Sequence, residues 1–383
     1  MTSLAADEPG NRGARTSCQE SRTVSETAIA ADWTAAWRRS DAGMSRTWWA
    51  WARTLGGAAI LGALVYRLGT GPFLEAVRRI NGWSLATAAA IGLLTTVCCA
   101  WRWSLVARGL GVGLPLRAAV AAYYRSQFLN TTLPGGVLGD VHRAVRHGRD
   151  VGDAGLGLRA VAWERFAGQV VQIVLSITVL FLLPSPVRSS MPVLATVAMA
   201  GALCAVLLGR ALPHDGPSLW GRTVRTASAD LSGGLLARRA WPGVVLASAV
   251  AVAGHAVTFL VAARTAGSTV SPVRMLPLAL LVLLAMGIPT NIAGWGPREG
   301  MAAWAFSVAG LSAAQGVATA VVYGVMVLVA SLPGAGVLIA GRLLRGTAGQ
   351  HGRGTGGKRG PRRSDRPRSR PPATASPEGA VHG

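Results

Sequence analysis

The sequence predicts an all-α protein, a polytopic transmembrane bundle of about eight helices with two broken or re-entrant segments. First, the 383 residues are 51% hydrophobic and only 14% charged, whereas soluble domains carry about a quarter charged residues. Second, several apolar stretches reach the roughly 20 residues that a spanning helix needs. Third, two polar phrases rich in Gly and Pro interrupt the apolar chain, and this repetition suggests two related halves.

Seven apolar stretches are predicted to span the membrane. Trp residues at the ends of the first two stretches fit an aromatic belt at the membrane interface. Arg102, between Trp101 and Trp103, is interpreted as an interfacial side chain that reaches toward water. An even number of spans is needed to place both chain ends on the same side of the membrane. With seven predicted spans, one of the two broken segments must therefore also cross the membrane fully. The predicted spans are 47–67, 84–107, 165–183, 191–211, 242–264, 272–290 and 315–341.

Polar segments flank the predicted membrane domain of residues 47–342. Residues 1–46 and the Arg-, Gly-, Pro- and Ser-rich residues 343–383 are expected to be disordered. Met44, just before the first span, is a candidate for the true start of the chain. The formal net charge of +22 concentrates in termini and loops, which membrane topology explains more simply than nucleic-acid binding. We therefore expect a multi-pass protein of the bacterial plasma membrane with both termini in the cytoplasm.

The first polar phrase is FLNTTLPGGVLGD at residues 128–140. Its break leaves backbone groups unpaired, which a membrane tolerates only inside protein or beside a watery cavity. Asp140 and Arg143 are three residues apart on the following helix, where their side chains can pair. A water-exposed loop is the alternative interpretation. The residues that stop the helix are Pro134, Gly135 and Gly136. The polar side chains around the break are Arg125, Asn130, Asp140 and Arg143.

The second polar phrase is IPTNIAGWGPREG at residues 288–300. Pro297 suits the first turn of a new helix, and the helix dipole favours Glu299 near that start. The neighbouring Arg298 gives this phrase an arginine and an acid, as in the first phrase. A tight exposed turn is the alternative. The residues that break the chain are Pro289, Asn291, Gly294 and Gly296.

Between the two phrases, a predicted helix carries a polar stripe on one face. Its members recur at spacings of three and four residues, and Glu164 borders them. Such a stripe on a spanning helix faces either a cavity or neighbouring helices that it hydrogen-bonds. His255 and Thr258 add polar groups to a later span, where a lone His is more often a packing residue. The stripe consists of Arg165, Gln169, Gln172 and Ser176.

In this order, the motifs resemble those of the lysylphosphatidylglycerol synthase transmembrane region, or flippase-like domain, family. The matching elements are LPGG…GD…R after an Arg and an Asn, the ER pair at 164–165, and P…G.G.RE near the end. Ala293 stands where a second glycine is common, and Pro297 is inserted before Arg298. The resemblance implies a short form without the aminoacyl-transferase domain of the bifunctional members, so lysyl transfer is not expected.

Together these observations predict a translocase for an anionic phospholipid or a polyprenyl-phosphate-linked substrate. Arginine binds phosphate through paired hydrogen bonds. No nucleotide motif, nucleophile constellation or metal-ligand spacing stands out, so catalytic, metal and cofactor sites are not predicted. The predicted head-group residues are Arg125, Asn130, Arg143, Arg165 and Arg298, with Asp140, Glu164 and Glu299 as their charge partners.

Two alternatives to transport come from other functional classes. One is a non-transporting membrane subunit that scaffolds a glycosyltransferase or another envelope-lipid enzyme. The other is a membrane-embedded transferase with Asp140 or Glu299 as its base. Head-group translocation in vesicles separates both alternatives from a translocase.

Overall fold

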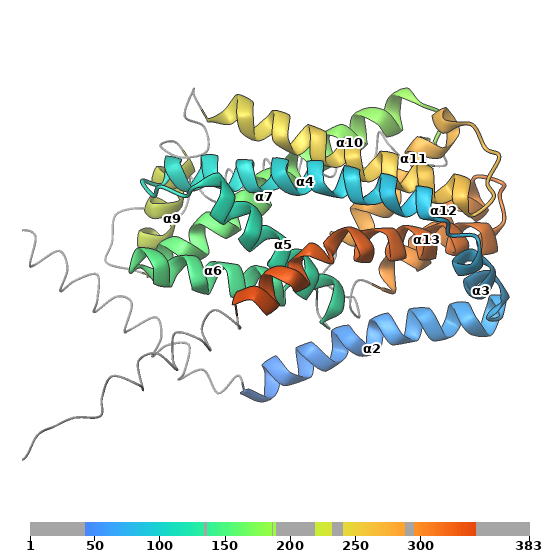
Figure 1. Ribbon diagram of the computed structural model, residues 1–383, viewed down its shortest axis with the longest axis horizontal. Coiled ribbons are helices and arrows are strands. Elements are labelled where there is room, and N and C mark those ends of the chain that lie inside the picture. The colour runs from blue at the N-terminus through green and yellow to red at the C-terminus, as the bar shows by residue number, and fades with distance from the viewer. Residues whose placement is uncertain are drawn as a thin grey trace, which may run out of the picture. The chain divides into compact units, whose positions relative to one another are not determined.

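The computed structural model describes the membrane part of the chain, and throughout the described residues the regular structure is helical without a strand (Figure 1). The all-α prediction is thereby confirmed. The predicted tails up to residue 42 and from 342 lie outside the described residues, as do the predicted span 191–211 and Pro134, Gly135, Pro289, Asn291 and Gly294. The described residues are 43–133, 136–185, 187–188, 219–231, 240–287 and 295–341.

Four helices in the described part of the chain are long and apolar enough to cross a membrane, with 25 to 29 residues each. They confirm the predicted spans at 84–107, 165–183, 242–264 and 315–341. The second begins well before residue 165, because Asp153 accepts a hydrogen bond from the Leu156 backbone N–H (2.9 Å) and caps it. The four are α4 (Gly82–Gly109), α7 (Ala154–Leu182), α10 (Trp241–Thr265) and the helical run Ala313–Gly341, which α13 (Ala313–Ser331) opens.

Each polar phrase separates a pair of short helices. The first pair is α5 (Leu116–Thr132, 17 residues) and α6 (Leu138–Val151, 14 residues). The second is α11 (Pro272–Met286, 15 residues) and α12 (Pro297–Val308, 12 residues). At 1.5 Å per residue these helices are about 18–26 Å long, less than the roughly 30 Å hydrocarbon core. Each pair therefore has the dimensions of a re-entrant hairpin, and the predicted full span at 272–290 is wrong.

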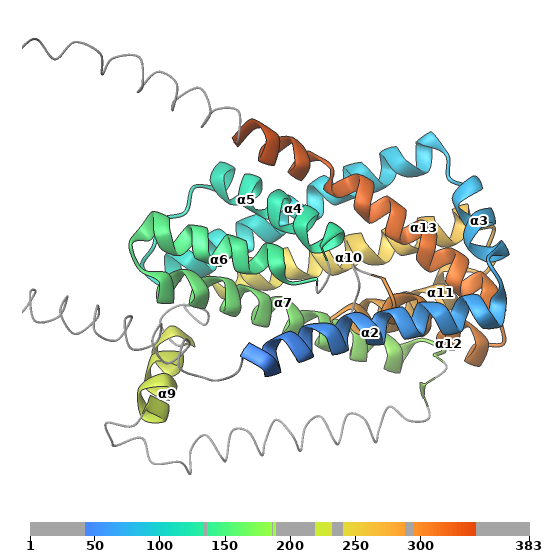
Figure 2. The ribbon, with the colours of Figure 1, turned by 90° about the horizontal axis from the view of Figure 1, so that it is seen from below.

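The order long, short, short, long occurs twice, in α4–α7 and in α10–α13. Figures 1 and 2 show the α5–α6 hairpin entering from one end of the bundle and the α11–α12 hairpin from the opposite end, with α4 and α10 running in opposite directions. Equivalent helices also pack in equivalent pairs. Helix α6 packs on α7 in the first half, and α12 packs on α13 in the second. Across the two halves, α4 packs on α13 and, equivalently, α10 packs on α7. The two halves are therefore an inverted structural repeat, an arrangement found in many transporters.

Three helices of the described residues lie outside the repeats. The N-terminal helix α2 (Gly43–Leu68) covers the first predicted span. Its part Ala58–Leu68 is long and apolar enough for a span only together with α3 (Gly71–Arg78), which it meets at 94°, so this span stays a prediction. The chain turns between them at Gly69, whose φ of 72° favours glycine. Helix α9 (Leu219–Asp230) is joined to α7 through its last residue, because Asp230 accepts a hydrogen bond from the Trp163 indole (3.1 Å).

Close backbone contacts hold each hairpin in place. A Cβ atom at Gly139 of α6 would lie 2.0 Å from the Ser126 carbonyl oxygen of α5. A Cβ at Gly157 of α7 would lie 2.4 Å from the Gly148 nitrogen, and one at Gly316 of α13 would lie 2.4 Å from the Ala302 carbonyl oxygen. Small residues that allow such close approach are typical of helix packing in membranes.

We expect Gly139→Ala to destabilise the protein by about 1–3 kcal/mol, because the added methyl group forces the two helices of the hairpin apart. The thermal unfolding midpoint in detergent measures the effect. Gly62→Ala in α2 is the control, since a Cβ there would meet nothing within 4 Å. Equal midpoints for the two variants would contradict the close contact.

Candidate functional site

Glu164 of α7 is the centre of a buried ion cluster. Its side chain is 0% exposed, and it accepts hydrogen bonds from Arg102 Nε of α4 (2.9 Å) and Arg143 Nη2 of α6 (2.8 Å). The Tyr123 hydroxyl of α5 donates a third at 3.2 Å. One carboxylate thus joins all four helices of the first repeat. Removing charges from water is costly, so such a group persists only when its partners surround it.

Arg102 is a member of this cluster that the sequence interpretation missed. The residue is only 5% exposed and also donates a hydrogen bond to Ser248 Oγ of α10 (3.0 Å). Gly168 leaves the space for its guanidinium group, because a Cβ there would lie 2.6 Å from Arg102 Nη1. The expected interfacial position of Arg102 is therefore wrong. Trp103 beside it is also buried rather than interfacial.

Arg143 is enclosed by aromatic rings. Its guanidinium carbon lies 4.5 Å from the Trp103 ring centroid and 4.3 Å from the Tyr123 ring centroid. These cation–π contacts add to its bonds with Glu164 and stabilise a side chain that is 0% exposed. The predicted pairing with Asp140 is also present, at 3.1 Å between Arg143 Nη2 and Asp140 Oδ1.

Asp140 links the cluster to the tip of the first hairpin. Its Oδ2 atom lies 2.6 Å from Arg165 Nη2 and accepts a hydrogen bond from Asn130 Nδ2 at 3.0 Å. Its Oδ1 atom accepts one from the Ser126 hydroxyl at 3.0 Å. The Asn130 side-chain oxygen in turn accepts the Gly139 backbone N–H at 2.7 Å. The side chains on both sides of the break therefore fix the hairpin and position Arg165.

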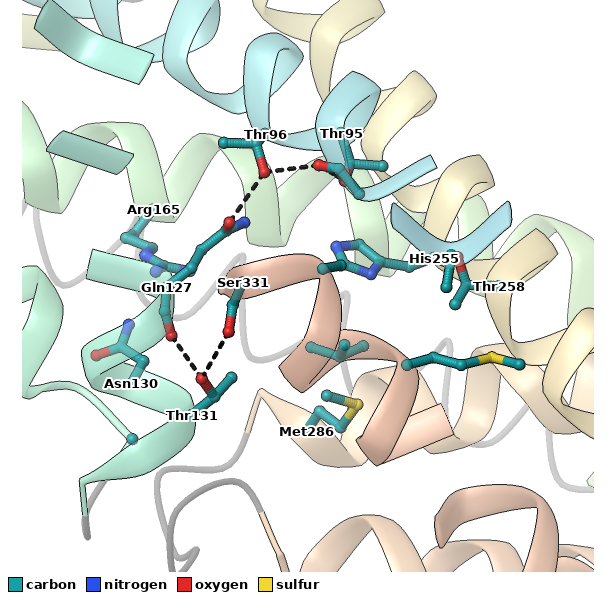
Figure 3. Close-up of a pocket in the computed structure, with 16 residues that line it drawn as sticks. Thr95, Thr96, Gln127, Asn130, Thr131, Arg165, His255, Thr258, Met286 and Ser331 are labelled. Atoms are coloured by element: carbon teal, nitrogen blue, oxygen red, sulfur yellow. Dashed lines mark hydrogen bonds between the residues drawn. The ribbon is translucent and has the colours of Figure 1, made fainter. Parts of the chain in front are cut away.

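A cavity of about 230 Å³, with polar and apolar residues in its lining, lies among helices of both halves (Figure 3). Gly136 of the first break and Met286 at the end of α11 both line it. Arg165 also lines it, and its side chain is 44% exposed, whereas Arg102 and Arg143 are enclosed. The other polar side chains of the lining include those of Thr96, Gln127, Asn130, Thr131, His255 and Ser331.

Hydrogen bonds tie the cavity wall to four helices. The Thr96 hydroxyl of α4 donates to Gln127 Oε1 of α5 (2.9 Å), and the Thr131 and Ser331 hydroxyl oxygens lie 3.3 Å apart between α5 and α13 (Figure 3). His255 Nδ1 of α10 lies 3.1 Å from the Tyr323 hydroxyl of α13. Hydroxyl, amide and imidazole groups thus surround the space into which Arg165 projects.

The polar stripe on α7 serves both of the purposes that the sequence left open. Arg165 reaches the cavity, whereas Gln172 Nε2 donates a hydrogen bond to the Leu283 carbonyl oxygen of α11 at 2.9 Å. Ser176, further along the stripe, is fully buried. The stripe therefore begins at the cavity and continues as a contact between helices.

The second hairpin holds its charges within a single helix. Arg298 Nε donates to Glu299 Oε1 at 2.8 Å, and Glu299 Oε2 accepts the Gly296 backbone N–H at 2.7 Å, at the start of α12. Arg298 also lies over the Trp295 ring, 4.7 Å from its centroid. A Cβ at Gly324 of α13 would lie 2.3 Å from Arg298 Nη2, so glycine leaves this space too. Both charges are buried and compensate each other.

The structure thus divides the five residues predicted to bind a head group. Arg165 and Asn130 line the cavity. Arg143 and Arg298 are enclosed by protein groups, and Arg125 is half-buried on α5 outside the described lining. Head-group binding by these residues stays a prediction.

The fold and the site define a polytopic helical membrane protein with an arginine-bearing cavity lined by helices of both halves. The chain belongs to the lysylphosphatidylglycerol synthase TM region family, whose model matches residues 50–334. This range contains both hairpins, the ion cluster and the cavity, and it confirms the family resemblance of the motifs. No curated protein shows significant similarity to the chain.

We expect Glu164→Gln to lower the free energy of unfolding by about 3–5 kcal/mol, because two buried arginines lose their shared carboxylate. Denaturant titration in micelles measures the loss. Glu75→Gln is the control: its ion pair with Arg79 has side chains 64% and 47% exposed, so the loss is about 0–1 kcal/mol. A loss for Glu164→Gln no larger than that of the control would contradict a buried cluster.

Proposed function

We propose that the protein moves, or helps to move, a lipid with an anionic head group between membrane leaflets, and that the cavity beside Arg165 receives this head group. The observation that carries the proposal is the half-exposed Arg165 side chain in the cavity, whereas the other described arginines of the ion clusters are enclosed. Ionisable side chains inside a membrane protein are costly and typically mark substrate pathways.

The charge of the ion cluster supports an anionic ligand. Three arginines (Arg102, Arg143 and Arg165) share two carboxylates (Asp140 and Glu164). This set leaves one excess positive charge, and Arg165 is the member that reaches open space. A guanidinium group has five N–H donors in a planar fork that matches phosphate oxygens. A phosphate beside Arg165 would therefore balance the charge and use donors that Asp140 leaves available.

The inverted repeat supports movement rather than static binding. Transporters with inverted repeats bind substrate near the membrane midplane, between broken helices, and expose that site to each side in turn. Here both opposed hairpins contribute to the wall of one cavity, the first at Gly136 and the second at Met286, the last residue of α11.

The distribution of arginines supports a cytoplasmic location for the end of the bundle from which α5–α6 enters. Several arginines lie near the helix termini at this end of the bundle. Helix α9, which contacts the first part of α7, adds Arg225. The opposite end also carries arginines, in α2, α3, α10 and α11, but among the described residues no short helix there has two arginines as α9 does. We therefore favour a plasma-membrane orientation with both termini in the cytoplasm. The arginines at the α5–α6 end are Arg108, Arg117, Arg146, Arg149 and Arg159.

The test is head-group translocation by purified protein in vesicles that contain a fluorescent phosphatidylglycerol, with a membrane-impermeant reductant as the reporter of exposed label. We expect Arg165→Gln to lower the protein-dependent rate at least tenfold, because the loss of a charge-assisted, paired hydrogen bond costs about 1.5–3 kcal/mol. Arg149→Gln, on the exposed surface of α6, is the matched control and keeps the wild-type rate.

Two results would contradict the proposal. One is equal rates for wild type and Arg165→Gln when both variants are folded. The other is a wild-type rate no higher than that of protein-free vesicles, together with copurification of a glycosyltransferase. That second result would favour the scaffolding alternative.

A further inference from the structure

The lining of the cavity narrows the chemistry of the head group. We infer that the cavity takes a phosphodiester monoanion that carries a small hydroxylated group, rather than an aminated lipid or a diphosphate-linked sugar. This inference rests on the proposed function and specifies the substrate class of the same site. Four observations support it: the charge of the cluster, the chemistry of the lining, the commitment of the carboxylates and the size of the space.

The excess of a single positive charge matches a ligand with a single negative charge. A phosphodiester carries one, and its binding beside Arg165 would leave Arg102, Arg143, Arg165, Asp140 and Glu164 neutral as a set with the ligand. A diphosphate or a phosphomonoester brings further negative charge into the membrane interior, where uncompensated charge is costly. A zwitterionic head group would leave the excess charge unbalanced.

The described lining of the cavity contains no Asp or Glu. Both carboxylates of the ion cluster are committed elsewhere. Asp140 receives hydrogen bonds or ion pairs from Ser126, Asn130, Arg143 and Arg165. Glu164 receives them from Arg102, Tyr123 and Arg143. An ammonium group in the cavity would find no anionic partner and would lie near Arg165, which repels it.

The remaining polar side chains suit hydroxyl groups. The hydroxyls of Thr96, Thr131 and Ser331 donate to carbonyl oxygens of their own helices, so each offers a lone pair that accepts a hydrogen bond from a ligand hydroxyl. The Gln127 and Asn130 amides also line the cavity, and each has a donor hydrogen beyond the bonds it makes to the described residues. The Thr131 and Ser331 oxygens are 3.3 Å apart, longer than the usual 2.7–2.8 Å for two hydroxyls. This long contact can exchange for bonds to a ligand hydroxyl at little cost.

His255 adds a donor at the α10 side of the cavity. Tyr323 is fully buried, and its hydroxyl has His255 Nδ1 as its hydrogen-bond partner at 3.1 Å. A buried phenol needs an acceptor for its proton. If Tyr323 donates to Nδ1, the neutral imidazole carries its own proton on Nε2. The ring projects from α10 into the cavity (Figure 3), so this N–H is available to a ligand oxygen.

The cavity is small. Its volume of about 230 Å³ is below the roughly 300–1,000 Å³ of sites for drug-sized ligands. A phosphate with a glycerol or a single sugar is of this order, whereas an oligosaccharide is not. Two sources share that chemistry: a glycerophospholipid such as phosphatidylglycerol, and a polyprenyl phosphate that carries one sugar.

The experiment compares protein-dependent translocation of four acyl- or prenyl-chain-labelled lipids in otherwise identical vesicles. The four are phosphatidylglycerol, phosphatidylethanolamine, phosphatidic acid and a short polyprenyl phosphohexose. We expect at least a tenfold preference for one or both phosphodiester monoanions over phosphatidylethanolamine and phosphatidic acid. The ratio of the translocation rate of phosphatidylglycerol to that of the polyprenyl phosphohexose distinguishes the two sources. Equal rates for all four lipids would overturn the inference but leave translocation intact, whereas the absence of movement for all four would refute the proposed function itself.

A carboxylate placed in the lining tests the same inference from the protein side. We expect Thr131→Asp to raise the rate ratio of phosphatidylethanolamine to phosphatidylglycerol at least tenfold, because the new charge compensates an ammonium and repels a phosphate. Thr131→Asn, of the same size without charge, keeps the wild-type ratio. Ser331→Asp, from the facing helix, repeats the test if Thr131→Asp does not fold. An unchanged ratio in a folded Asp variant would overturn the inference.

Discussion

The contact of Glu164 with two arginines is the interaction on which the first half of the structure depends. Helices α4, α5, α6 and α7 each contribute a side chain to it, through Arg102, Tyr123, Arg143 and Glu164 itself. In a membrane no water is available to satisfy these groups, so the helices must stay close enough for the side chains to satisfy one another. Gly139, Gly157 and Gly168 leave the space for this approach. The short hairpin is thereby held beside α7, and Arg165 is directed into the cavity.

The two halves of the repeat use similar chemistry with different consequences. Each half encloses one hairpin arginine beside aromatic rings, Arg143 in the first and Arg298 in the second. The first half shares its charges among several helices and leaves one in excess. The second half pairs Arg298 with the adjacent Glu299 and is neutral within α12. The excess positive charge therefore lies in the first half, while the second half contributes α10, α11 and α13 residues to the cavity wall.

The fold class was predictable because the membrane allows few structures: apolar runs of sufficient length must be helices whose backbone is satisfied internally. The breaks were predictable because Pro and Gly are clustered there, whereas single residues such as Pro277 and Gly168 remain inside α11 and α7. The pairing of Asp140 with Arg143 was predictable because it is local, three residues apart on one helix. The inverted orientation of the halves was beyond the sequence, since only the tertiary structure shows from which end each hairpin enters.

Two predictions failed for related reasons. Arg102 has its partner 62 residues away, and its apolar and Trp neighbours are equally typical of a membrane interface. Composition alone does not separate these environments; an unpaired acid in another span, here Glu164, was the available signal. The apolar run that begins at Pro272 is nearly long enough to span, but its helix ends at Met286. Length alone does not distinguish a complete span from one arm of a hairpin.

The central claim is that a lipid phosphate binds beside Arg165 in the cavity. A structure of the protein in nanodiscs that contain phosphatidylglycerol tests it most directly. We predict phosphate density about 2.7–2.9 Å from the Arg165 guanidinium nitrogens, with the head-group hydroxyls toward Thr131 and Ser331. Ordered phosphatidylglycerol elsewhere on the protein, with only water in the cavity beside Arg165, would contradict the claim.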